Sequence, residues 1–425
     1  MAFSYTKALT ALQKLSEVHD IETLLQKLNP TETPEVVRSG FPSRELLNLH
    51  AMDARVEFLE QNTGAKLDLL ARNKPMDDLN VLEGNIENYI GMSRVPTGVI
   101  GPIKVIGSAA DGDFFVPLAT SEGALVASYH RGAKATFLAG GVRSVCLTQG
   151  VQRAPLFRFK NLGELGTFLL WLLPLEDKFR EIVSQTSRYA QLDDLSTNIE
   201  GNQLTLLFNY ITGDASGQNM VTICTDAICQ WIIQNCPVQP ECWYVEGNFS
   251  GDKKATAQSF LNVRGKKVTA ETELPKEVIE GVLKTSADKI AQYCQSSTLG
   301  TIQSGSIGAQ GHYANGLAAL FIATGQDAAC VSEAAVGITR MEARKDGSLY
   351  AAVTLPNLIV GTVGGGTALP TQRECLELMD CYGPDKARKF AEIAAAMVLA
   401  GELSIASALS VGHFTSAHER LGRKK

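Results

Sequence analysis

The chain of 425 residues lacks several features that mark common classes of protein. It has no excess of basic residues, because 39 lysines and arginines face 45 acidic residues and the net charge is −6. This balance argues against a nucleic-acid-binding protein, whose phosphate contacts need a basic surface. None of the nine cysteines forms a Cys-x-x-Cys pair. The sequence therefore indicates neither a metal site nor a redox dithiol, and reduced thiols in a cytoplasmic protein are the simplest interpretation.

Long hydrophobic runs are also missing. The most apolar stretch is Phe168–Leu173, which is followed by Pro174. It is far shorter than the roughly 20 apolar residues that a membrane-spanning helix needs, so we interpret it as the buried face of a helix. The first 30 residues do not have the pattern of a signal peptide. The sequence thus predicts a cytoplasmic protein that does not bind a membrane.

A third missing feature is the Gly-x-Gly-x-x-Gly spacing of a Rossmann site in the segment Gly213–Met220. This segment nevertheless follows a short apolar stretch, Leu204–Tyr210, which predicts a buried strand. It precedes a helix that we expect from Gln218 to Gln234. Glycine lets a backbone approach a phosphate, and a helix N-terminus favours anions. From the residues alone, Asp214 fits a nucleotide-binding loop and a helix N-cap about equally well.

The length of the chain predicts two or three domains. Leucines at helical intervals, interrupted by prolines, predict short amphipathic helices up to about residue 85. From about residue 91 the pattern predicts a mixed α/β arrangement. The local expectations are a helix start at Ser43–Leu46, a helix from Thr120 to about Leu138, strands over Ser348–Val363, and an alanine-rich helix over Lys386–Ser410.

The segment Gly251-Asp252-Lys253-Lys254 is chemically the most informative. It places an acid beside two lysines shortly after a predicted strand, Glu241–Val245. A lysine beside a carboxylate stays charged and fixed, which suits it to stabilising the oxyanion that forms when a carbonyl is attacked. For an isolated charge run, a solvated loop is the more common explanation. Three further polar motifs in apolar or glycine-rich surroundings favour catalysis, and they are Thr120–Gly123, Gly325–Ala329 and Gly412–His418.

Together with Glu87–Gly91, Gly213–Met220 and Gly361–Thr367, these four motifs resemble the catalytic core of hydroxymethylglutaryl-CoA (HMG-CoA) reductase. The resemblance lies in their order and spacing, and the Asp-Lys-Lys form is similar to the class I, biosynthetic branch. It implies reduction of HMG-CoA to mevalonate and CoA in isoprenoid biosynthesis, with NADPH as the cofactor. Animal and plant relatives also carry a membrane anchor, and we expect this chain to act without one.

The resemblance further implies three domains. A helical N-terminal domain would cover residues 1–90. A large substrate- and CoA-binding α/β domain would consist of residues 91–153 and 254–425. A small dinucleotide-binding domain without a Rossmann fold, residues 155–245, would be inserted into it.

Four catalytic residues follow from the resemblance. Lys253 would stabilise the alkoxide as a thioester carbonyl accepts hydride, and Asp327 would set the pKa of this lysine. His418 would protonate the departing CoA thiolate. Glu122 would assist Lys253 in the second reduction. We expect Glu122 in the first turn of a helix, where its anion is stabilised, so this role requires burial or a neighbouring carboxylate such as Asp327.

Binding residues are implied in the same way. The acyl group and CoA would be held by Ser128, Arg131, Arg153, Asp252, Lys254, His312, Asn315 and Ser404. The cofactor would be held by Ser187, Arg188, Asp214, Ser216, Gly217, Gln218, Asn219, Gly365, Gly366 and Arg423, with Ser187 and Arg188 near the 2′-phosphate. Without the resemblance, Asp327, in the helix-like run Leu317–Ala329, also fits an exposed helix position and His418 a solvated tail.

The sequence departs from the family pattern at several positions. Ser216 replaces the usual methionine of the dinucleotide loop, and Glu246 replaces an acyl-pocket serine. A lysine of animal relatives falls on Ser296 or Ser297, and Lys424 stands where those relatives carry a regulatory phosphoserine. Two alternatives therefore stay open. One is a reductase of the same fold with altered acyl-CoA specificity, and the other is a non-catalytic protein that binds CoA or a nucleotide.

The segment Glu87–Gly91 resembles the dimerisation segment of the family. The resemblance implies a homodimer, or a dimer of dimers, with active sites at the subunit interface. One subunit would supply the small domain and Asp327, and the other would supply Glu122. From the residues alone, the segment is an ordinary linker.

Overall fold

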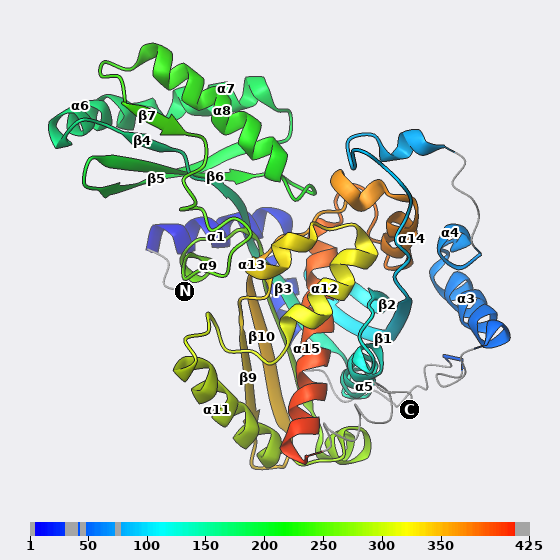
Figure 1. Cartoon of the computed structure of the whole chain (residues 1–425). Coiled ribbons are helices and arrows are strands. Elements are labelled where there is room, and N and C mark those ends of the chain that lie inside the picture. Colours follow the sequence, from blue (N-terminus) through cyan, green and yellow to red (C-terminus); the bar gives the residue numbers. More distant parts are fainter. Residues whose placement is uncertain (1–4, 30–40, 43–47, 73–77, 413–425) are drawn as a thin grey trace.

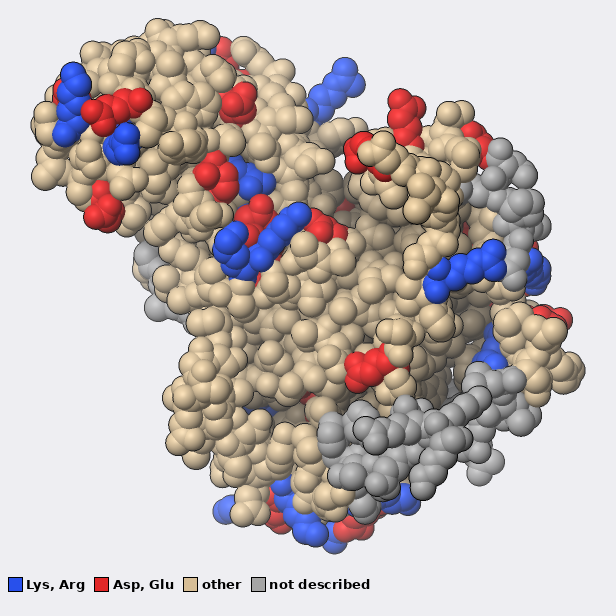
Figure 2. Space-filling model, in the orientation of Figure 1, with Lys and Arg blue, Asp and Glu red and all other residues tan. Residues whose placement is uncertain are grey.

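The structure is a computed structural model that describes residues 5–29, 41–42, 48–72 and 78–412. It has the mixed α/β composition that the sequence predicts, with two packed regions joined by one long strand (Figure 1). Charged side chains of both signs are interspersed on the face seen in Figure 2.

The N-terminal part is helical, as predicted. Its elements are α1 (Tyr5–Val18), α2 (Ile21–Leu28), α3 (Leu49–Thr63), α4 (Asp68–Ala71) and the 3₁₀ helix η1 (Leu79–Leu82). Helix α3 starts after Asn48, whose side chain accepts the Ala51 N–H, because an N-cap oxygen satisfies a free amide of the first turn. The start predicted at Ser43–Leu46 lies outside the described residues. Leu59 of α3 packs with Phe115 of the main sheet in a small hydrophobic cluster.

The larger region is built on a sheet with the strand order β2-β1-β3-β8-β10-β9. All pairs are antiparallel except β1 with β3. The strands are β1 (Thr97–Gly107), β2 (Asp111–Ala119), β3 (Val142–Arg153), β8 (Gly265–Leu274), β9 (Ile338–Ala343) and β10 (Leu349–Leu358). Alternating burial along β8 shows why this sequence forms a strand with one face against the core.

Helix α15 (Ala387–Ser410) forms where the sequence predicts an alanine-rich helix and packs against this sheet, and α5 (Leu125–Leu138) packs on α15. A Cβ at Gly132 of α5 would lie 1.8 Å from the Ala400 carbonyl oxygen, so glycine permits the close crossing. Of the described residues, α15 alone is long and apolar enough to cross a membrane, but 83% of its apolar window is buried inside the protein. Its apolarity therefore matches its position in the core.

The smaller region has its own sheet and its own core. Strand β3 leaves the main sheet and its last residues, Val151–Arg153, pair with β6 (Gln203–Ile211). The other strands are β4 (Leu156–Arg158), β5 (Gln191–Glu200) and β7 (Cys242–Tyr244). Helices α6 (Leu162–Leu172), α7 (Glu176–Thr186) and α8 (Gln218–Asn235) pack with the sheet around a separate hydrophobic cluster. The precise division into domains at residues 91, 155 and 245 stays a prediction.

The remaining helical elements complete the two regions and the segments that link them. They are η2 (Leu173–Leu175), α9 (Gln258–Leu261), α10 (Lys276–Val278), the π-helical η3 (Ile279–Leu283), α11 (Ala287–Gln303), α12 (Tyr313–Thr324), η4 (Ala328–Cys330), α13 (Val331–Ala334), η5 (Gly365–Ala368) and α14 (Pro370–Leu378).

Three boundaries that the sequence predicted are wrong. The helix expected from Thr120 starts only at Leu125, after Ala124 adopts a left-handed φ of 70°, so Glu122 lies in a loop and not in a first helical turn. The strand within Ser348–Val363 ends at Leu358. The apolar helix α12 ends at Thr324, and the left-handed Gly325 turns the chain before Asp327. Two of the predicted catalytic carboxylates therefore lie outside regular α-helix, where local side-chain positions depend on tertiary contacts.

Candidate active site

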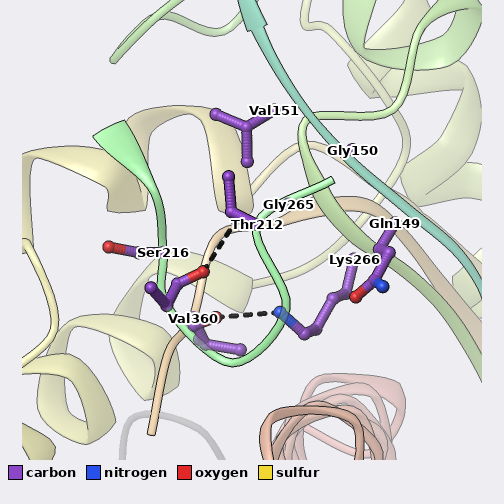
Figure 3. A pocket seen from close by; sticks show the side chains of 9 residues that line it. Gln149, Gly150, Val151, Thr212, Ser216, Gly265, Lys266 and Val360 are labelled. Carbon is purple, nitrogen blue, oxygen red and sulfur yellow. Dashed lines mark hydrogen bonds between the residues drawn. The ribbon is translucent and has the colours of Figure 1, made fainter. Parts of the chain in front are cut away.

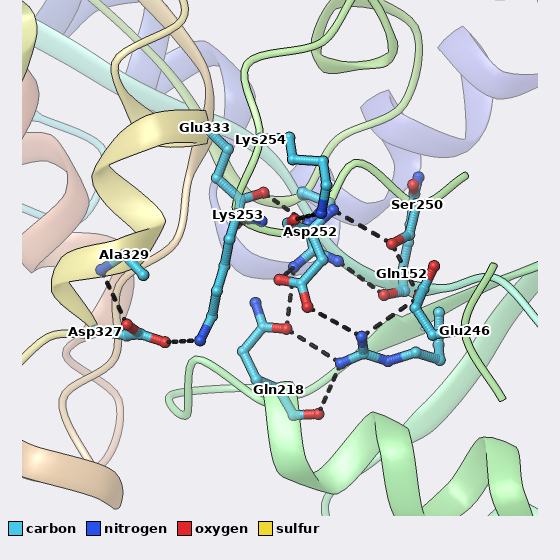
Figure 4. Close-up of polar contacts among 12 residues, drawn as sticks. Gln152, Gln218, Glu246, Ser250, Asp252, Lys253, Lys254, Asp327, Ala329 and Glu333 are labelled. Carbon is cyan, nitrogen blue, oxygen red and sulfur yellow. Dashed lines mark hydrogen bonds and ion pairs between the residues drawn. The ribbon is translucent and has the colours of Figure 1, made fainter. Parts of the chain in front are cut away.

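Lys253 and Asp327 form an ion pair, with the Lys253 Nζ 2.9 Å from the Asp327 Oδ2 (Figure 4). The lysine comes from the loop after β7 and the aspartate from the turn between α12 and α13. Asp327 Oδ1 accepts the Ala329 N–H at 3.0 Å, which fixes the carboxylate as the cap of η4. The two side chains are 46% and 39% exposed, so the pair is open to a ligand.

The pair shifts the pKa values of both groups. The hydrogen bond that Lys253 donates to Asp327 raises the pKa of Lys253, although partial burial opposes this. Burial alone would raise the pKa of Asp327, but the hydrogen bonds from Lys253 and the Ala329 N–H, together with the charge of Lys253, outweigh it and lower this pKa. Both groups are therefore charged at neutral pH, and the ammonium group is a fixed cation of the kind that stabilises an oxyanion.

Beside this pair lies a buried network centred on Arg264. Its Nε is 2.7 Å from the Glu333 Oε2, and its other nitrogens donate to Asp252 Oδ1 at 2.8 Å, Gln218 Oε1 at 3.0 Å and the Gln152 carbonyl at 2.8 Å. Glu333 is fully buried and also accepts the Lys253 backbone N–H. The network therefore joins the lysine loop to the start of α8 and to β3.

Arg153 and Glu246 belong to the same network. Arg153 Nη1 lies 3.1 Å from Asp252 Oδ2 and 3.4 Å from Glu246 Oε2. Glu246 Oε2 also accepts the Ala154 N–H and the Ser250 hydroxyl. The departure at Glu246 thus has a local explanation, because its carboxylate binds Arg153 and the neighbouring chain. Arg153, predicted to hold the acyl carboxylate, is buried and already paired, whereas Lys254 is exposed and donates to the Asp252 carbonyl.

The predicted dinucleotide loop lies next to the lysine–aspartate pair. Gln326 accepts the Gly361 N–H, and the Thr362 N–H donates to the Asp214 carbonyl, so three separate loops are tied together. A Cβ at Gly325 would lie 2.1 Å from the Gly366 carbonyl oxygen, so these glycines allow the loops to touch. Figure 3 shows the small pocket that Ser216 and Lys266 help to line, where the buried Lys266 donates to the Val360 carbonyl.

The Asp214 side chain does not cap its own helix, which was one of the two interpretations that the sequence left open. Its carboxylate accepts the N–H groups of Asp385 and Ala387 at 2.8 and 3.0 Å and so caps α15, not its own helix α8. Gly217 takes the N-cap position of α8 with a left-handed φ of 81°. A cofactor at this loop would therefore meet backbone at Asp214, not the carboxylate.

The predicted CoA residues come together. Ser128 Oγ lies 2.9 Å from Ser404 Oγ, and Arg131 donates to the Ser404 carbonyl at 2.7 Å. The predicted acyl-pocket residue His312 stacks on Tyr129, and its Nδ1 is 3.0 Å from Glu402 Oε1. Burial alone would raise the pKa of Glu402, but hydrogen bonds from His312 and the backbone lower it. Glu402 thus fixes the orientation of the imidazole.

Glu122 is placed apart from the pair. Its side chain accepts a long hydrogen bond, 3.4 Å, from Asn315 Nδ2. Within the described parts of the chain, no hydrogen bond or ion pair joins Glu122 to Lys253 or Asp327. Ser187 ends α7 and its hydroxyl accepts the N–H groups of Tyr189 and Ala190, while Arg188 is exposed. His418 and Arg423 lie outside the described residues.

Sequence reasoning missed Arg264, Glu333 and Glu402. Each is a charged residue in a largely apolar or glycine-rich stretch, and buried charges of this kind are rare unless they are paired. That signal was present, but it does not tell which partner each charge has. Over residues 5–29, 41–42, 48–72 and 78–412, no group of three or more histidine, cysteine or acidic side chains is arranged to hold a metal ion.

Comparisons with known proteins agree with this architecture. The solved structure of class II 3-hydroxy-3-methylglutaryl-CoA reductase from Streptococcus pneumoniae, bound to NADPH in open conformations, superposes with a TM-score of 0.67. It is 19% identical in sequence and covers 84% of this chain and 96% of that chain. At this identity the likeness shows the fold alone. The chain therefore shares the fold of this solved reductase.

Comparisons of the sequence with known proteins give a more specific result than the comparison of folds. The family model described as hydroxymethylglutaryl-coenzyme A reductase matches residues 51–423. The 3-hydroxy-3-methylglutaryl-coenzyme A reductase of Aeropyrum pernix is 44% identical over 372 residues, which are 86% of this chain and 88% of that protein. That of Pyrococcus horikoshii is 42% identical over 380 residues, 88% and 92% of the two chains. The chain belongs to the HMG-CoA reductase family, and the resemblance inferred from its motifs is confirmed.

Proposed function

We propose that the protein reduces HMG-CoA to mevalonate and CoA at its lysine–aspartate pair, with NADPH as the reductant. The observation that carries this proposal is the Lys253–Asp327 pair, partly exposed and next to the loop of residues 213–219. Family membership supplies the reaction class and the mevalonate pathway. NADPH is supported by the NADPH-bound structure of similar fold.

The loops beside the pair fit a dinucleotide. Gly213, Gly364 and Gly365 all have left-handed φ values, and a Cβ at any of them would meet nothing within 4 Å. Their backbone is thus open to a phosphate. We assign cofactor binding to Ser216, Gly217, Gln218 and Asn219, to Asp214 through its backbone, to Gly365 and Gly366, and to Ser187, Arg188 and Arg423. When bound, NADPH would supply the hydride in each of two reductions.

The residues of the chain then have distinct tasks. Lys253 stabilises the negative charge on the carbonyl oxygen, and Asp327 holds its ammonium group in place. Glu122, in its loop beside Asn315, assists in protonating the aldehyde oxygen. His418 protonates the CoA thiolate, a role that stays a prediction. The acyl-CoA is bound by His312, which Glu402 fixes, and by the cluster of Ser128, Arg131 and Ser404. The acyl end lies near Asn315, Asp252, Arg153 and Lys254.

The decisive experiment is oxidation of NADPH followed by absorbance with HMG-CoA as substrate, repeated with other acyl-CoA thioesters. We expect two equivalents of NADPH to be consumed for each HMG-CoA. Faster turnover of another acyl-CoA would favour the second candidate, a reductase of altered specificity. One observation favours that candidate, namely that Arg153 is already paired with Glu246 and Asp252. Absence of any turnover with intact cofactor binding would indicate a binding protein.

We also propose a cytoplasmic homodimer with shared sites. The absence of a contact between Glu122 and Asp327 within the described residues of one chain supports this arrangement. Inactive Glu122→Gln and Asp327→Asn protomers, mixed and allowed to exchange, should recover activity. Random assortment makes about half of the dimers heterodimers, and each heterodimer has one complete site of its two. Recovery therefore approaches roughly a quarter of the wild-type rate. No recovery after proven exchange would place each site within one chain.

A further inference from the structure

Two carboxylates on one short segment hold the same lysine at both ends. Asp327 Oδ2 contacts the Lys253 Nζ at 2.9 Å, and Glu333 Oε1 accepts the Lys253 backbone N–H at 3.0 Å (Figure 4). The segment consists of η4 and α13, and its backbone is itself hydrogen-bonded, since the Cys330 N–H donates to the Asp327 carbonyl. The spacing between the two acids is therefore fixed by regular structure.

The backbone of Lys253 requires such a hold. Its φ is +54°, in the left-handed region that residues with a Cβ adopt at a cost of about 1–2 kcal/mol. A residue in this region persists only when its surroundings determine it. Relaxation to a right-handed or extended φ would change the direction in which the Lys253 side chain leaves the backbone. The Nζ would then move away from Asp327.

Glu333 is in turn fixed by Arg264. The two side chains are 0% and 1% exposed, and the Glu333 Oε2 lies 2.7 Å from the Arg264 Nε. Burial raises the pKa of Glu333, and the Arg264 guanidinium opposes that rise. Arg264 also donates to Asp252, the residue before Lys253, and to Gln218, the first residue of α8. One buried cation therefore connects the lysine loop with the loop that we assign to the dinucleotide.

We propose that Glu333, held by Arg264, is a positioning residue that sets the backbone of Lys253 and thereby directs its ammonium group at Asp327 and at the reacting carbonyl. Its catalytic consequence rests on the proposed function, whereas the hold on Lys253 does not. Glu333 touches neither substrate nor cofactor in this role. It acts only through the conformation of Lys253.

The test compares Glu333→Gln with a matched control, Glu392→Gln. Glu392 is equally buried and accepts the backbone N–H groups of Ala109, Ala110 and Cys146, none of which belongs to the lysine loop. Glutamine at position 333 keeps the size of the side chain, but an NH2 group replaces one of the two oxygens that accept from Arg264 and from the Lys253 N–H, so one of the two contacts is lost. Both variants lose one buried carboxylate, so a general loss of stability affects them alike.

Two readouts are measured on the full chain. The first is the rate at which acetic anhydride acetylates Lys253 at about pH 9, quantified by mass spectrometry with Lys254 as the internal reference. We expect at least about a threefold rise in Glu333→Gln, because a lysine that loses its carboxylate partner has a lower pKa and more free amine. The second is kinetics, where kcat falls about 10- to 100-fold while KM for HMG-CoA changes less than about threefold, since small misplacements of a catalytic group have effects of this size.

The outcomes separate the positioning role from the proposed function. Unchanged acetylation of Lys253 in Glu333→Gln, or an equal change in Glu392→Gln, overturns the positioning role whatever the kinetics. Raised acetylation in a protein whose wild type does not reduce HMG-CoA supports the positioning role and refutes the proposed function. If Glu333→Gln does not fold, Arg264→Lys replaces it, because lysine lacks the planar fork through which Arg264 donates to Glu333 and to Asp252 from different nitrogens. The same two readouts and the same expected directions then apply.

Discussion

Two ion pairs lie side by side around the same loop and differ in their surroundings. Their distances are nearly equal, 2.9 Å between Lys253 and Asp327 and 2.7 Å between Arg264 and Glu333. The first pair is partly exposed, and the second is almost completely buried. A pair in water contributes little to stability, whereas removing one partner of a buried pair leaves a charge without solvent. Distance alone therefore does not reveal what a pair does.

The comparison teaches how the site divides its tasks. The exposed pair can contact a ligand, and its substitution costs the protein little stability, which suits a group that acts on a substrate. The buried pair cannot meet a ligand and instead fixes the loop from which Lys253 projects. We expect substitutions at the buried pair to cost stability and to lower the rate only through Lys253, whereas substitutions at the exposed pair lower the rate at little cost in stability.

The largest expected effect is on stability at the buried pair. Arg264→Met should lower the free energy of unfolding by about 3–5 kcal/mol, because Glu333 would be left as an uncompensated buried charge. Urea denaturation measures this difference. Arg373→Met is the control, since Arg373 forms a largely exposed pair with Glu377 on α14 and its loss should cost less than about 1 kcal/mol. Equal losses in the two variants would remove the distinction between buried and exposed pairs.

The next effect is on rate at the exposed pair. Lys253→Ala should lower kcat about 100- to 1,000-fold, as loss of an oxyanion-stabilising group does, and change the free energy of unfolding by less than about 1 kcal/mol. Steady-state kinetics and urea denaturation on the same preparation measure both quantities. Lys254→Ala should mainly raise KM if Lys254 binds the substrate in the ground state, as we propose. A Lys253→Ala enzyme that keeps more than about a tenth of the wild-type kcat would contradict the role of Lys253.

A smaller effect is expected in the small region, at the exposed Arg188. Arg188→Ala should weaken NADPH binding by about tenfold or more and leave NADH binding nearly unchanged, since a charge-assisted hydrogen bond to the 2′-phosphate contributes about 1.5–3 kcal/mol. Titration of each cofactor by fluorescence measures the two dissociation constants. Equal weakening of both cofactors would move Arg188 away from the 2′-phosphate.

The smallest effect is the contribution of the exposed pair to stability and its pH dependence. Asp327→Asn should cost less than about 1 kcal/mol at neutral pH because solvent screens the pair. The pKa of Asp327 is lowered on folding, so its contribution is present above its ordinary value of 3.8 and is lost as the pH falls through the lower folded value. The pKa of Lys253 is raised, so its contribution is lost only as the pH rises above 10.5 through the higher folded value. Urea denaturation at several pH values should show a flat difference between these limits, and a maximum near pH 6 would exclude the pair as its source.

Much of the local structure could be predicted from the sequence. Helix α15, strand β6 and helix α8 were predicted within about one residue of their ends, because an apolar pattern of the right period and length fixes such elements. The predictions failed at Ala124 and Gly325, where a left-handed residue ends or delays a helix. Sequence patterns do not encode such a turn at an alanine, because residues with a Cβ rarely adopt a left-handed φ.

The sequence by itself determined the family, the mixed α/β class and the candidate residues Lys253 and Asp327, because short motifs in a fixed order need no knowledge of their partners. Only the tertiary structure showed that Asp214 caps α15, that Glu246 binds Arg153, and that Arg264 and Glu333 support the lysine loop. These contacts join residues far apart in the chain. Their partners are fixed by how the two sheets and α15 pack, and a residue's own sequence neighbourhood does not specify which buried charge it will meet.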